Sequence, residues 1–211
     1  MTAPIDNPVR GRLNAAFFRL MDRYVHFVLG DRKQQLLADL PDTVVEIGPG
    51  AGTNLRYYRP GTTLIAVEPN VHMHGRLRRA AARRHIRLDL LPVGAEDTGL
   101  RAGSVDAVVC TLVLCTVPDP AAVLAEVRRL LRPGGRLLFV EHVGAPQRSA
   151  LGLLQRLLHP LWRWCFEGCE LRRHTAGTLE AADFRAIDLE HYRLRSAFLP
   201  VNAQIAGTAT A

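Results

Sequence analysis

The chain has 211 residues, of which 48% are hydrophobic and 22% are charged, and its formal net charge is +7. Such a chain is long enough for one complete α/β domain, and its composition excludes a disordered or fibrous protein. No apolar run is long enough to span a bilayer, and the first residues lack the basic and apolar stretches of a secretory signal, so we expect a cytoplasmic location.

The positive charge comes almost entirely from arginine, because Lys33 is the only lysine. The densest basic stretch, residues 76–87, has no aromatic side chains between its arginines. Aromatic stacking is typical of single-stranded nucleic-acid binding, so we expect no nucleic-acid partner. The solvated face of a surface helix accounts for this stretch. Peripheral contact with an anionic membrane surface is the alternative, and we expect no integral membrane segment.

Four cysteines occur: Cys110, Cys115, Cys165 and Cys169. None belongs to a C-x-x-C motif, and no paired His/Cys set has the spacing of a zinc site, so we predict no bound metal. In a cytoplasmic chain these thiols should be reduced. Cys110 lies in an apolar run and is expected in the core, whereas His72 and His74 are expected on the surface of a helix.

The predicted elements begin with helices. Apolar residues between 13 and 29 recur at helical spacing, Gly30-Asp31 predicts a break, and residues 32–40 resume the helix up to Pro41. We therefore expect residues 1–41 to form a cover of two helices ahead of the first strand. Such a cover encloses a ligand pocket or packs on the sheet, and the two roles are compatible.

A glycine turn lies between two apolar runs. Residues 43–45 lead into Glu46-Ile47-Gly48-Pro49-Gly50-Ala51-Gly52-Thr53, and residues 63–67 end at Glu68. This order reads as strand, glycine turn, helix start and second strand, which is how an open α/β sheet holds an adenosine-bearing cofactor at its carboxyl edge. Glycine permits positive φ and close approach of the backbone to a ligand, and the acid suits a pair of ribose hydroxyls.

The glycine spacing distinguishes between cofactors. Dinucleotide folds carry G-x-G-x-x-G and rest a pyrophosphate on the helix N-terminus, whereas here Gly48, Gly50 and Gly52 alternate and Glu46 precedes them. A carboxylate at this point would repel a pyrophosphate but could serve a cationic amino-acid or sulfonium group. The stretch resembles the first motif of class I S-adenosylmethionine (SAM) methyltransferases, E/D-x-G-x-G-x-G.

That resemblance implies a set of cofactor contacts. The three glycines would pass close to the methionine portion of SAM, and Glu68 would take the ribose hydroxyls. The other implied cofactor-binding residues flank the same two turns: Glu46, Pro49, Asn54, Pro69 and Asn70. The alternative is an ordinary strand, turn and helix that binds no ligand.

Beyond the glycine turn, the pattern predicts helices at 54–58 and 71–84 and a third strand at 86–91. The turn that follows, Gly94-Ala95-Glu96-Asp97, resembles the adenine contact of the same family, in which a carboxylate accepts the exocyclic amine. Ala95 belongs to this expected contact, and the carboxylate is either Glu96 or Asp97. An Asx-type turn or a helix cap is the alternative.

A nearly all-apolar fourth strand is predicted at 107–112, as for a central parallel strand covered on both faces. Its last residues, Thr111 and Leu112, are expected to contact cofactor and acceptor together. A helix then starts at Pro118-Asp119-Pro120, with proline near its first turn, and should stop at Arg132-Pro133-Gly134-Gly135.

The rest of the chain completes the expected fold. A fifth strand at 136–140 ends in Glu141-His142, and an apolar segment with both tryptophans follows. We expect an α/β, Rossmann-like sheet of seven strands, mostly parallel with the last strand antiparallel, and helices on both faces. The predicted single domain, 1–211, comprises the helical cover (1–41), a SAM-binding core (42–143), a helical substrate cap (149–175) and C-terminal strands (176–211).

The second half also resembles the methyltransferase-like protein seven group, the animal alkyl-thiol S-methyltransferases. The likeness lies in Cys110-Thr111-Leu112-Val113-Leu114-Cys115, in the helix that ends at R-P-G-G, in Glu141-His142-Val143, in Pro160-x-Trp162 and in Gly168-Cys169. It implies methyl transfer from SAM to a small thiol or sulfide, with S-adenosylhomocysteine as the product. The animal proteins carry a hydrophobic anchor that this chain does not show, and aspartate where Glu68 stands.

His142 is the predicted catalytic residue, because it ends the fifth strand near where the methyl group should point and could accept a thiol proton near neutral pH. The alternative is a histidine that caps the following loop. Cys115 and Cys169 could instead bind a soft metalloid. Functional alternatives are N-, O- or C-methylation of a lipid, quinone or other small apolar molecule, and a non-catalytic SAM-binding protein; a monomer or a homodimer is expected.

Overall fold

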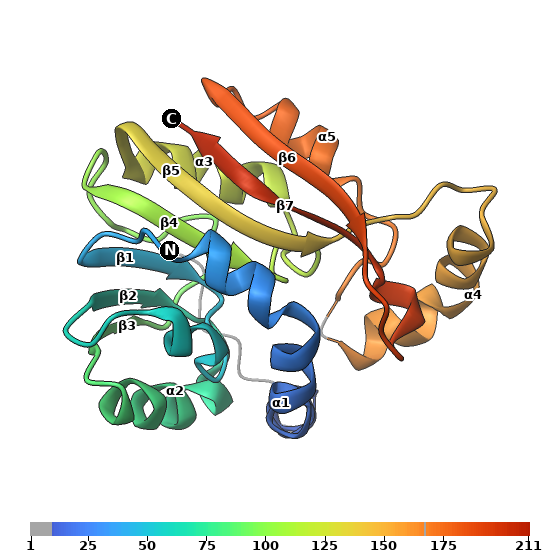
Figure 1. Cartoon of the computed structure of the whole chain (residues 1–211), viewed down its shortest axis with the longest axis horizontal. Coiled ribbons are helices and arrows are strands. Elements are labelled where there is room, and N and C mark those ends of the chain that lie inside the picture. Colours follow the sequence, from blue (N-terminus) through green and yellow to red (C-terminus); the bar gives the residue numbers. More distant parts are fainter. Residues whose placement is uncertain (1–9, 167) are drawn as a thin grey trace.

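The computed structural model describes residues 10–166 and 168–211; residues 1–9, part of the predicted helical cover, lie outside the described residues. The elements in chain order are α1 (Arg10–Leu36), β1 (Thr43–Ile47), η1 (Thr53–Tyr57), β2 (Thr63–Val67), α2 (Val71–Arg83), β3 (Arg87–Leu91), β4 (Val105–Thr111), α3 (Pro120–Leu130), β5 (Leu131–His142), α4 (Ala150–Cys165), α5 (Thr175–Glu180), β6 (Ala186–Arg193), η2 (Leu199–Val201) and β7 (Ala203–Thr210) (Figure 1).

The strands form one seven-stranded sheet in the order β3-β2-β1-β4-β5-β7-β6. Neighbours from β3 to β5 pair in parallel, while β7 runs antiparallel to both β5 and β6. The predicted Rossmann-like sheet with an antiparallel last strand is therefore confirmed. The order reverses between β1 and β4, and ligands of open α/β sheets bind outside the strand ends at such a reversal.

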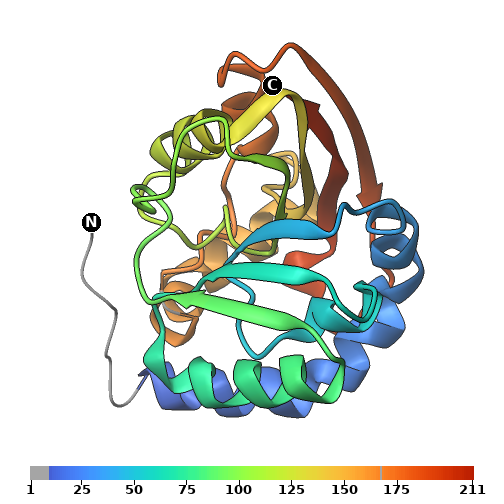
Figure 2. The same ribbon diagram turned by 90° about the vertical axis from the view of Figure 1, so that its left-hand side faces the viewer.

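Two hydrophobic cores cover the two faces of the sheet. Adjacent strand residues such as Val44 and Val45 point to opposite faces and enter different cores. One core joins the sheet to α3 and α5, and the other joins it to the end of α1, to η1 and to α2. Figure 2 shows α1 and α2 side by side along one face of the sheet, and in Figure 1 α4 stands off beyond the sheet.

The predicted break at Gly30-Asp31 is wrong, because α1 continues through both residues. Glycine inside a helix costs about 1 kcal/mol relative to alanine, yet here it has a packing reason. A Cβ at Gly30 would lie 2.9 Å from Nδ1 of His26, whose ring bonds the Tyr57 hydroxyl at 2.8 Å. The missing side chain lets α1 connect to η1, so the helical cover starts with one long helix.

The helix after the glycine turn and the start of β5 also differ from the sequence prediction. The helix after the glycine turn is a single 3-10 segment, η1. The R-P-G-G stretch lies within β5, which starts at Leu131 immediately after α3; the β4–β5 register shifts between Val105 and Ala107. A bulge at a strand start accommodates proline and glycine that a regular central strand would exclude. The predicted start of α3, with proline in its first turn, is confirmed, and Asp119 caps the helix by accepting the backbone N–H groups of Ala121 and Ala122.

Candidate functional site

A cavity of about 590 Å³ opens at the carboxyl edge of the sheet. It brings together most of the predicted site residues: Gly48, Pro49, Gly50, Glu68, Pro69, Asn70, Ala95, Glu96, Thr111, Leu112 and His142. Apolar and aromatic side chains of α1, the α4 segment and the loop before η2 form much of the remaining wall. A largely apolar cavity with a few convergent polar groups is typical of a small-molecule site.

The glycine turn has the backbone that its sequence predicted. Gly48 and Gly50 both have positive φ, +61° and +57°. A Cβ at Gly48 would lie 2.5 Å from Val113, so this position excludes a side chain for steric reasons. A Cβ at Gly50 would meet nothing within 4 Å, because it would project into open space. Gly50 therefore keeps the backbone accessible to a ligand at the cavity wall.

Three of the predicted contact residues around this turn do not line the cavity. Gly52 faces the opposite way, and a Cβ there would press on Ala80 and Leu77, so its role is the close packing of α2. Glu46 and Asn54 are buried in a polar network beneath the turn. Asn54 donates to Oε1 of Glu46 at 2.7 Å and to the Thr111 hydroxyl at 2.8 Å, while Tyr58 donates to the second oxygen of Glu46 at 2.7 Å. Of this network, Thr111 reaches the cavity wall.

Lys33 extends the network from α1 to the cavity wall. Its ammonium donates to Oδ1 of Asn54 at 3.0 Å, and the residue is only 3% exposed. Burial lowers the pKa of Lys33 to about 8, against the opposing attraction of Glu46. Burial likewise raises the pKa of Glu46. The only lysine of the chain is thus a desolvated cation beside the glycine turn.

Glu68 connects the ends of β1 and β2. Its two carboxylate oxygens accept the backbone N–H groups of Gly50 and Asn70, each at 2.8 Å. These contacts fix the carboxylate against the glycine turn at the point where a ribose was expected. His74 packs behind it, because its Nε2 lies 2.8 Å from the Glu68 carbonyl oxygen and the residue is buried. The prediction of a surface position for His74 is therefore wrong.

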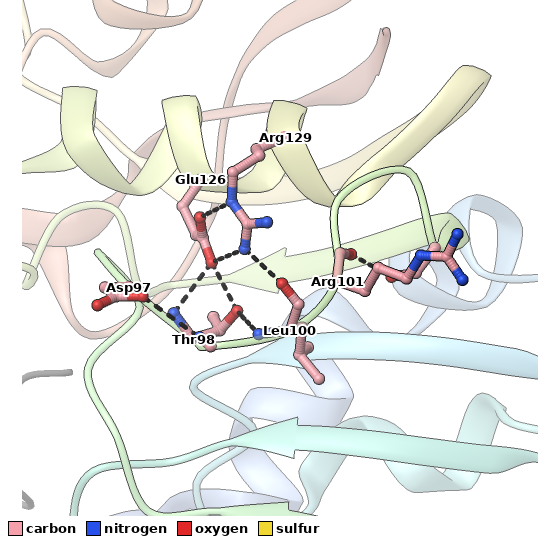
Figure 3. A network of polar contacts seen from close by, with 8 residues as sticks. Asp97, Thr98, Leu100, Arg101, Glu126 and Arg129 are labelled. Atoms are coloured by element: carbon pink, nitrogen blue, oxygen red, sulfur yellow. Dashed lines mark hydrogen bonds and ion pairs between the residues drawn. The ribbon is translucent and has the colours of Figure 1, made fainter.

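The acidic turn after β3 separates its two candidate carboxylates. Ala95 and Glu96 line the cavity, whereas Asp97 is exposed and accepts the Gly99 N–H at 3.3 Å. Figure 3 shows how Glu126 of α3 holds the next residue, accepting both the backbone N–H and the hydroxyl of Thr98. Asp97 forms the turn, and Glu96 is the acid that faces the cavity.

Thr111 and Leu112 meet the cavity at the end of β4, as predicted. Leu112 has a φ of +58°, a left-handed conformation that is costly for a branched side chain. Its N–H still pairs with the Val140 carbonyl at 2.8 Å, so the chain turns away from β5 immediately afterwards. That turn directs residues 113–115 across the top of β5.

Glu141 holds this turn in place. It is fully buried, and its carboxylate accepts the backbone N–H groups of Val113, Leu114 and Cys115 at 2.8, 3.1 and 3.4 Å. Burial raises the pKa of Glu141, while these three hydrogen bonds oppose the shift. A carboxylate that satisfies three successive amides fixes the loop that carries Cys115.

Three soft side chains meet at the far end of the cavity. His142 Nε2 lies 2.9 Å from Sγ of Cys169, the Sγ atoms of Cys169 and Cys115 lie 3.9 Å apart, and the Trp162 indole N–H donates to Cys169 Sγ at 3.3 Å. All four residues line the cavity. His142, predicted as the catalytic residue, therefore lies at the site but is engaged with a thiol.

The two thiols of this cluster have opposite acidities. The contact with Cys115, together with His142 and Trp162, lowers the pKa of Cys169 to about 4. The same contact with Cys169, together with burial, raises the pKa of Cys115 well above its ordinary value. Burial lowers the pKa of His142, but the neighbouring Cys169 raises it further, and the net direction is upward. The contact between Cys169 and His142 thus favours the ionised form of the thiol and the protonated form of the imidazole.

Sequence patterns did not predict two parts of this arrangement. The sequence offers one signal for a special role of Lys33, which is that it is the only lysine among 27 basic residues. Cys115 and Cys169 were considered together, but they are 54 residues apart and only the fold brings them to His142. No spacing rule reaches across such a separation.

The sheet reversal, the glycine turn and the acid at the end of β2 define a class I SAM-dependent methyltransferase. The sequence model of a methyltransferase domain matches residues 45–139. A SAM-dependent methyltransferase from Thermotoga maritima shares the fold with a TM-score of 0.67 and 19% identity, over 94% of this chain and 98% of that one. SAM is the cofactor of this class.

Similar proteins of named activity show which family of methyltransferases the chain belongs to. Thiol S-methyltransferase TMT1B of Rattus norvegicus is 38% identical over 189 residues, which cover 84% of this chain and 78% of the relative. Human thiol S-methyltransferase TMT1A is 34% identical over 192 residues, covering 86% and 79%. The chain belongs to the family of these thiol S-methyltransferases and is a SAM-dependent methyltransferase.

Proposed function

We propose that the chain transfers the methyl group of SAM to the sulfur of a small thiol or to sulfide. The observation that carries this proposal is the single cavity that joins the glycine turn and Glu68 to the cluster of Cys115, His142 and Cys169. Methyl transfer is an in-line displacement, so donor and acceptor must occupy two ends of one continuous space. The names of the rat and human relatives support sulfur as the acceptor atom.

At the donor end, the proposed contacts follow the cavity wall. Gly48 and Gly50 approach the methionine portion of SAM, with Pro49, Pro69 and Asn70 around them. Glu68 takes the ribose hydroxyls, and Ala95 and Glu96 meet the adenine. Thr111 and Leu112 lie between donor and acceptor. Three residues behind the cavity wall support the glycine turn: Glu46, Gly52 and Asn54. Asp97 shapes the loop that carries Ala95 and Glu96.

Lys33 is the proposed partner of the cofactor's carboxylate. The amino-acid portion of SAM carries one carboxylate, and Lys33 is a buried cation on the cavity wall that donates to Asn54 beneath the glycine turn. A buried charge is favourable only when it is paired, and the nearest polar partner, Asn54, is neutral. The cofactor's carboxylate would supply the charge that Asn54 does not.

At the acceptor end, His142 is the proposed catalytic residue. It lines the cavity together with Cys115 and Cys169. The aromatic rings of Trp162 and Phe166 form the cavity wall beside these three residues. Such walls suit a small apolar thiol and exclude water from the reacting atoms.

The test is a turnover assay with the purified chain and SAM. Alkyl thiols and sulfide are presented beside phenols, amines and quinones, and release of S-adenosylhomocysteine is measured. We expect turnover with thiols at least about tenfold faster than with the other acceptors. Faster turnover with phenols, amines or quinones would favour N-, O- or C-methylation, and SAM binding without any turnover would favour a non-catalytic SAM-binding protein.

We propose that the protein is cytoplasmic and that it is a monomer or a homodimer. The four cysteines are free thiols in the described chain, which is the usual state in a reducing compartment. None of the helices in residues 10–166 and 168–211 is long and apolar enough to cross a membrane. Cell fractionation and light scattering test location and assembly.

Peripheral contact with a membrane is supported by α4, whose Leu153, Leu157, Leu161 and Trp164 are exposed beside Arg156 and Arg163. We expect sedimentation with anionic vesicles that weakens in Leu157→Ser. Equal sedimentation of both proteins, or none, contradicts the role of α4.

A further inference from the structure

Three metal-ligating side chains from distant parts of the sequence converge in the cavity. Cys115 lies in the loop after β4, His142 ends β5, and Cys169 lies between α4 and α5. The ligand atoms that these residues offer all lie within 4.8 Å of one another, and all three residues are buried. Sequence spacing predicted no metal site, because the cysteines form no C-x-x-C motif and the chain shows no paired His/Cys set with zinc spacing.

Hydrogen bonds that do not involve the three ligand side chains hold the segments together: two are between backbone groups, and one comes from the guanidinium of Arg173. The N–H of Glu170 donates to the Cys115 carbonyl at 2.7 Å, which joins the two cysteine loops. Arg173 donates to the Leu114 carbonyl at 2.9 Å, and its own carbonyl accepts the Gly144 N–H at 2.9 Å, two residues beyond His142. The frame therefore sets the positions of the ligands without any bond between the thiols, which are free.

Two of the three distances between the ligand atoms lie close to those around a tetrahedral zinc ion, and the third is no longer than 4.8 Å. With Zn–S bonds of ~2.3 Å and Zn–N bonds of ~2.0 Å, ideal angles place two sulfurs roughly 3.8 Å apart and a sulfur and a nitrogen roughly 3.5 Å apart. The Sγ atoms of Cys115 and Cys169 are 3.9 Å apart. His142 Nε2 and Cys169 Sγ are 2.9 Å apart, so the imidazole would move by about half an ångström to admit the ion.

We propose that Cys115, His142 and Cys169 bind one zinc ion, and that its open fourth position receives the sulfur of the acceptor thiol. Three protein ligands with one exchangeable position are typical of catalytic zinc sites, whereas structural sites have four. Two thiolates and a neutral imidazole give the zinc centre no net charge, and a bound acceptor thiolate makes it singly negative. That charge faces the positive sulfonium of SAM.

The reaction at this centre balances without a further reactant. Coordination releases the acceptor's proton to solvent, leaving a zinc-bound thiolate. A lone pair of that sulfur forms the new bond to the methyl carbon, while the bond from the methyl carbon to the SAM sulfur breaks and its electron pair stays on that sulfur. The products are a neutral thioether, which binds zinc weakly and leaves, and S-adenosylhomocysteine. The acceptor part of this inference rests on the proposed function; the metal site does not.

Metal content tests the site directly. The chain is purified under reducing conditions with zinc supplied, and bound zinc is measured by elemental analysis and by chelator competition. We expect about one zinc ion per chain, with affinity reduced more than about 100-fold in Cys115→Ser and in Cys169→Ser. Cys165→Ser is the matched control, because Cys165 is half-buried and lies outside the cluster. Retained SAM binding shows that each variant is folded.

Cobalt in place of zinc tests the fourth position. Cobalt(II) in a tetrahedral sulfur and nitrogen site should give strong visible bands and thiolate charge-transfer bands, and adding propanethiol should strengthen the latter. A folded, SAM-binding wild type that retains no zinc and gives no such bands would overturn the site, as would equal metal binding by all three variants. An unchanged cobalt spectrum with a thiol that is turned over would overturn the acceptor role. Zinc binding without turnover of any thiol would confirm the site and contradict the proposed function instead.

Discussion

At the scale of single residues, Lys33 combines two properties that rarely occur together. It is almost fully buried, and its ammonium has a neutral amide, Asn54, as its direct partner. Twenty-six of the 27 basic residues are arginine, whose planar guanidinium is not interchangeable with the compact ammonium of lysine. A compact, desolvated cation of this kind is expected where a carboxylate arrives with a ligand.

Replacing Lys33 by methionine should weaken SAM binding roughly 10- to 100-fold, because a charged hydrogen bond is lost while the side-chain volume is kept. Calorimetry with S-adenosylhomocysteine measures the change. Arg32→Met is the matched control, since Arg32 pairs with Glu190 outside the cavity. An equal loss in both variants, or none in Lys33→Met, would contradict the assignment.

The same residue predicts a pH dependence of binding. Burial lowers the pKa of Lys33 to about 8 in the free protein, so its charged form is complete well below that pH and declines above it. A carboxylate binds the charged form better, and SAM affinity should therefore fall as the pH rises through about 8. Lys33→Met should show no decline over that range.

At the scale of secondary-structure elements, two helical glycines behave differently. Gly75 in α2 is exposed, and the nearest atom to a Cβ there is an Arg79 nitrogen at 3.7 Å. Gly30 in α1 is buried against the His26 ring, where the Cβ would lie 2.9 Å from Nδ1. Helix propensity is the same for both, so packing alone separates them.

Gly75→Ala should stabilise the protein by roughly 0.5–1 kcal/mol, since alanine restricts the unfolded chain more than glycine does. Gly30→Ala should gain nothing or lose up to about 1 kcal/mol, because the new methyl group displaces His26 from Tyr57. Urea unfolding of the two variants measures both values. An equal gain at the two sites would contradict the role assigned to Gly30.

A second feature at this scale ties the loop after β3, which is proposed to meet the adenine, to α3. Glu126 accepts from Thr98 and pairs with Arg129 at 2.6 Å, and Arg129 also donates to the Leu100 carbonyl (Figure 3). Burial raises the pKa of Glu126, but these hydrogen bonds outweigh it and lower the pKa to about 2. The loop that carries Ala95 and Glu96 is therefore held by an ionised carboxylate.

Glu126→Gln should cost on the order of 1–2 kcal/mol of unfolding free energy at neutral pH. The folded pKa lies below the unfolded value of about 4.3, so this contribution is complete above that value and is lost as the pH falls toward about 2. The difference between wild type and variant should shrink accordingly in acid. The control is Asp106→Asn, whose pair with Arg132 has the same 2.6 Å length but is half exposed, so its loss should change little.

At the scale of the whole molecule, the proposed donor and acceptor ends are built largely from different parts of the chain. The proposed donor end comes from the turns after the first three strands, and the proposed acceptor end from the loop after β4, the end of β5, α4 and the loop after it. Helix α1 reaches both, since Lys33 donates to Asn54 and Phe17 packs against Phe166. The two tryptophans of α4 probe this division, because Trp162 lines the cavity and Trp164 is 60% exposed.

Trp162→Ala should lower kcat/KM for a thiol by about tenfold or more, since it removes an aromatic wall and the indole N–H that donates to Cys169. The affinity for SAM should change less than about twofold. Trp164→Ala should alter neither quantity. Steady-state kinetics and calorimetry together decide, and a parallel loss of SAM affinity in Trp162→Ala would show that the two ends are not independent.

The sequence allowed the donor end to be predicted far better than the acceptor end. The glycine turn, Glu68 and the strand ends are local patterns, and β2 falls at the predicted residues 63–67. The convergence of Cys115, His142 and Cys169 depends on tertiary structure, as does the continuity of α1 past Gly30. Glu46 shows the limit within a motif: the pattern located the acid correctly, but only the packing of Asn54 and Tyr58 shows that it supports the turn from behind.

β7 is the last strand along the chain, yet it lies between β5 and β6 and pairs with residues 136–142 of β5 and 186–193 of β6. During synthesis on the ribosome, β5 therefore keeps an unpaired edge and β6 has no neighbour until residues 203–210 have emerged. Such an edge is a ready template for pairing with another nascent chain. The protein should accordingly depend on chaperones late in translation, and stalled chains that stop short of β7 should be the ones that aggregate.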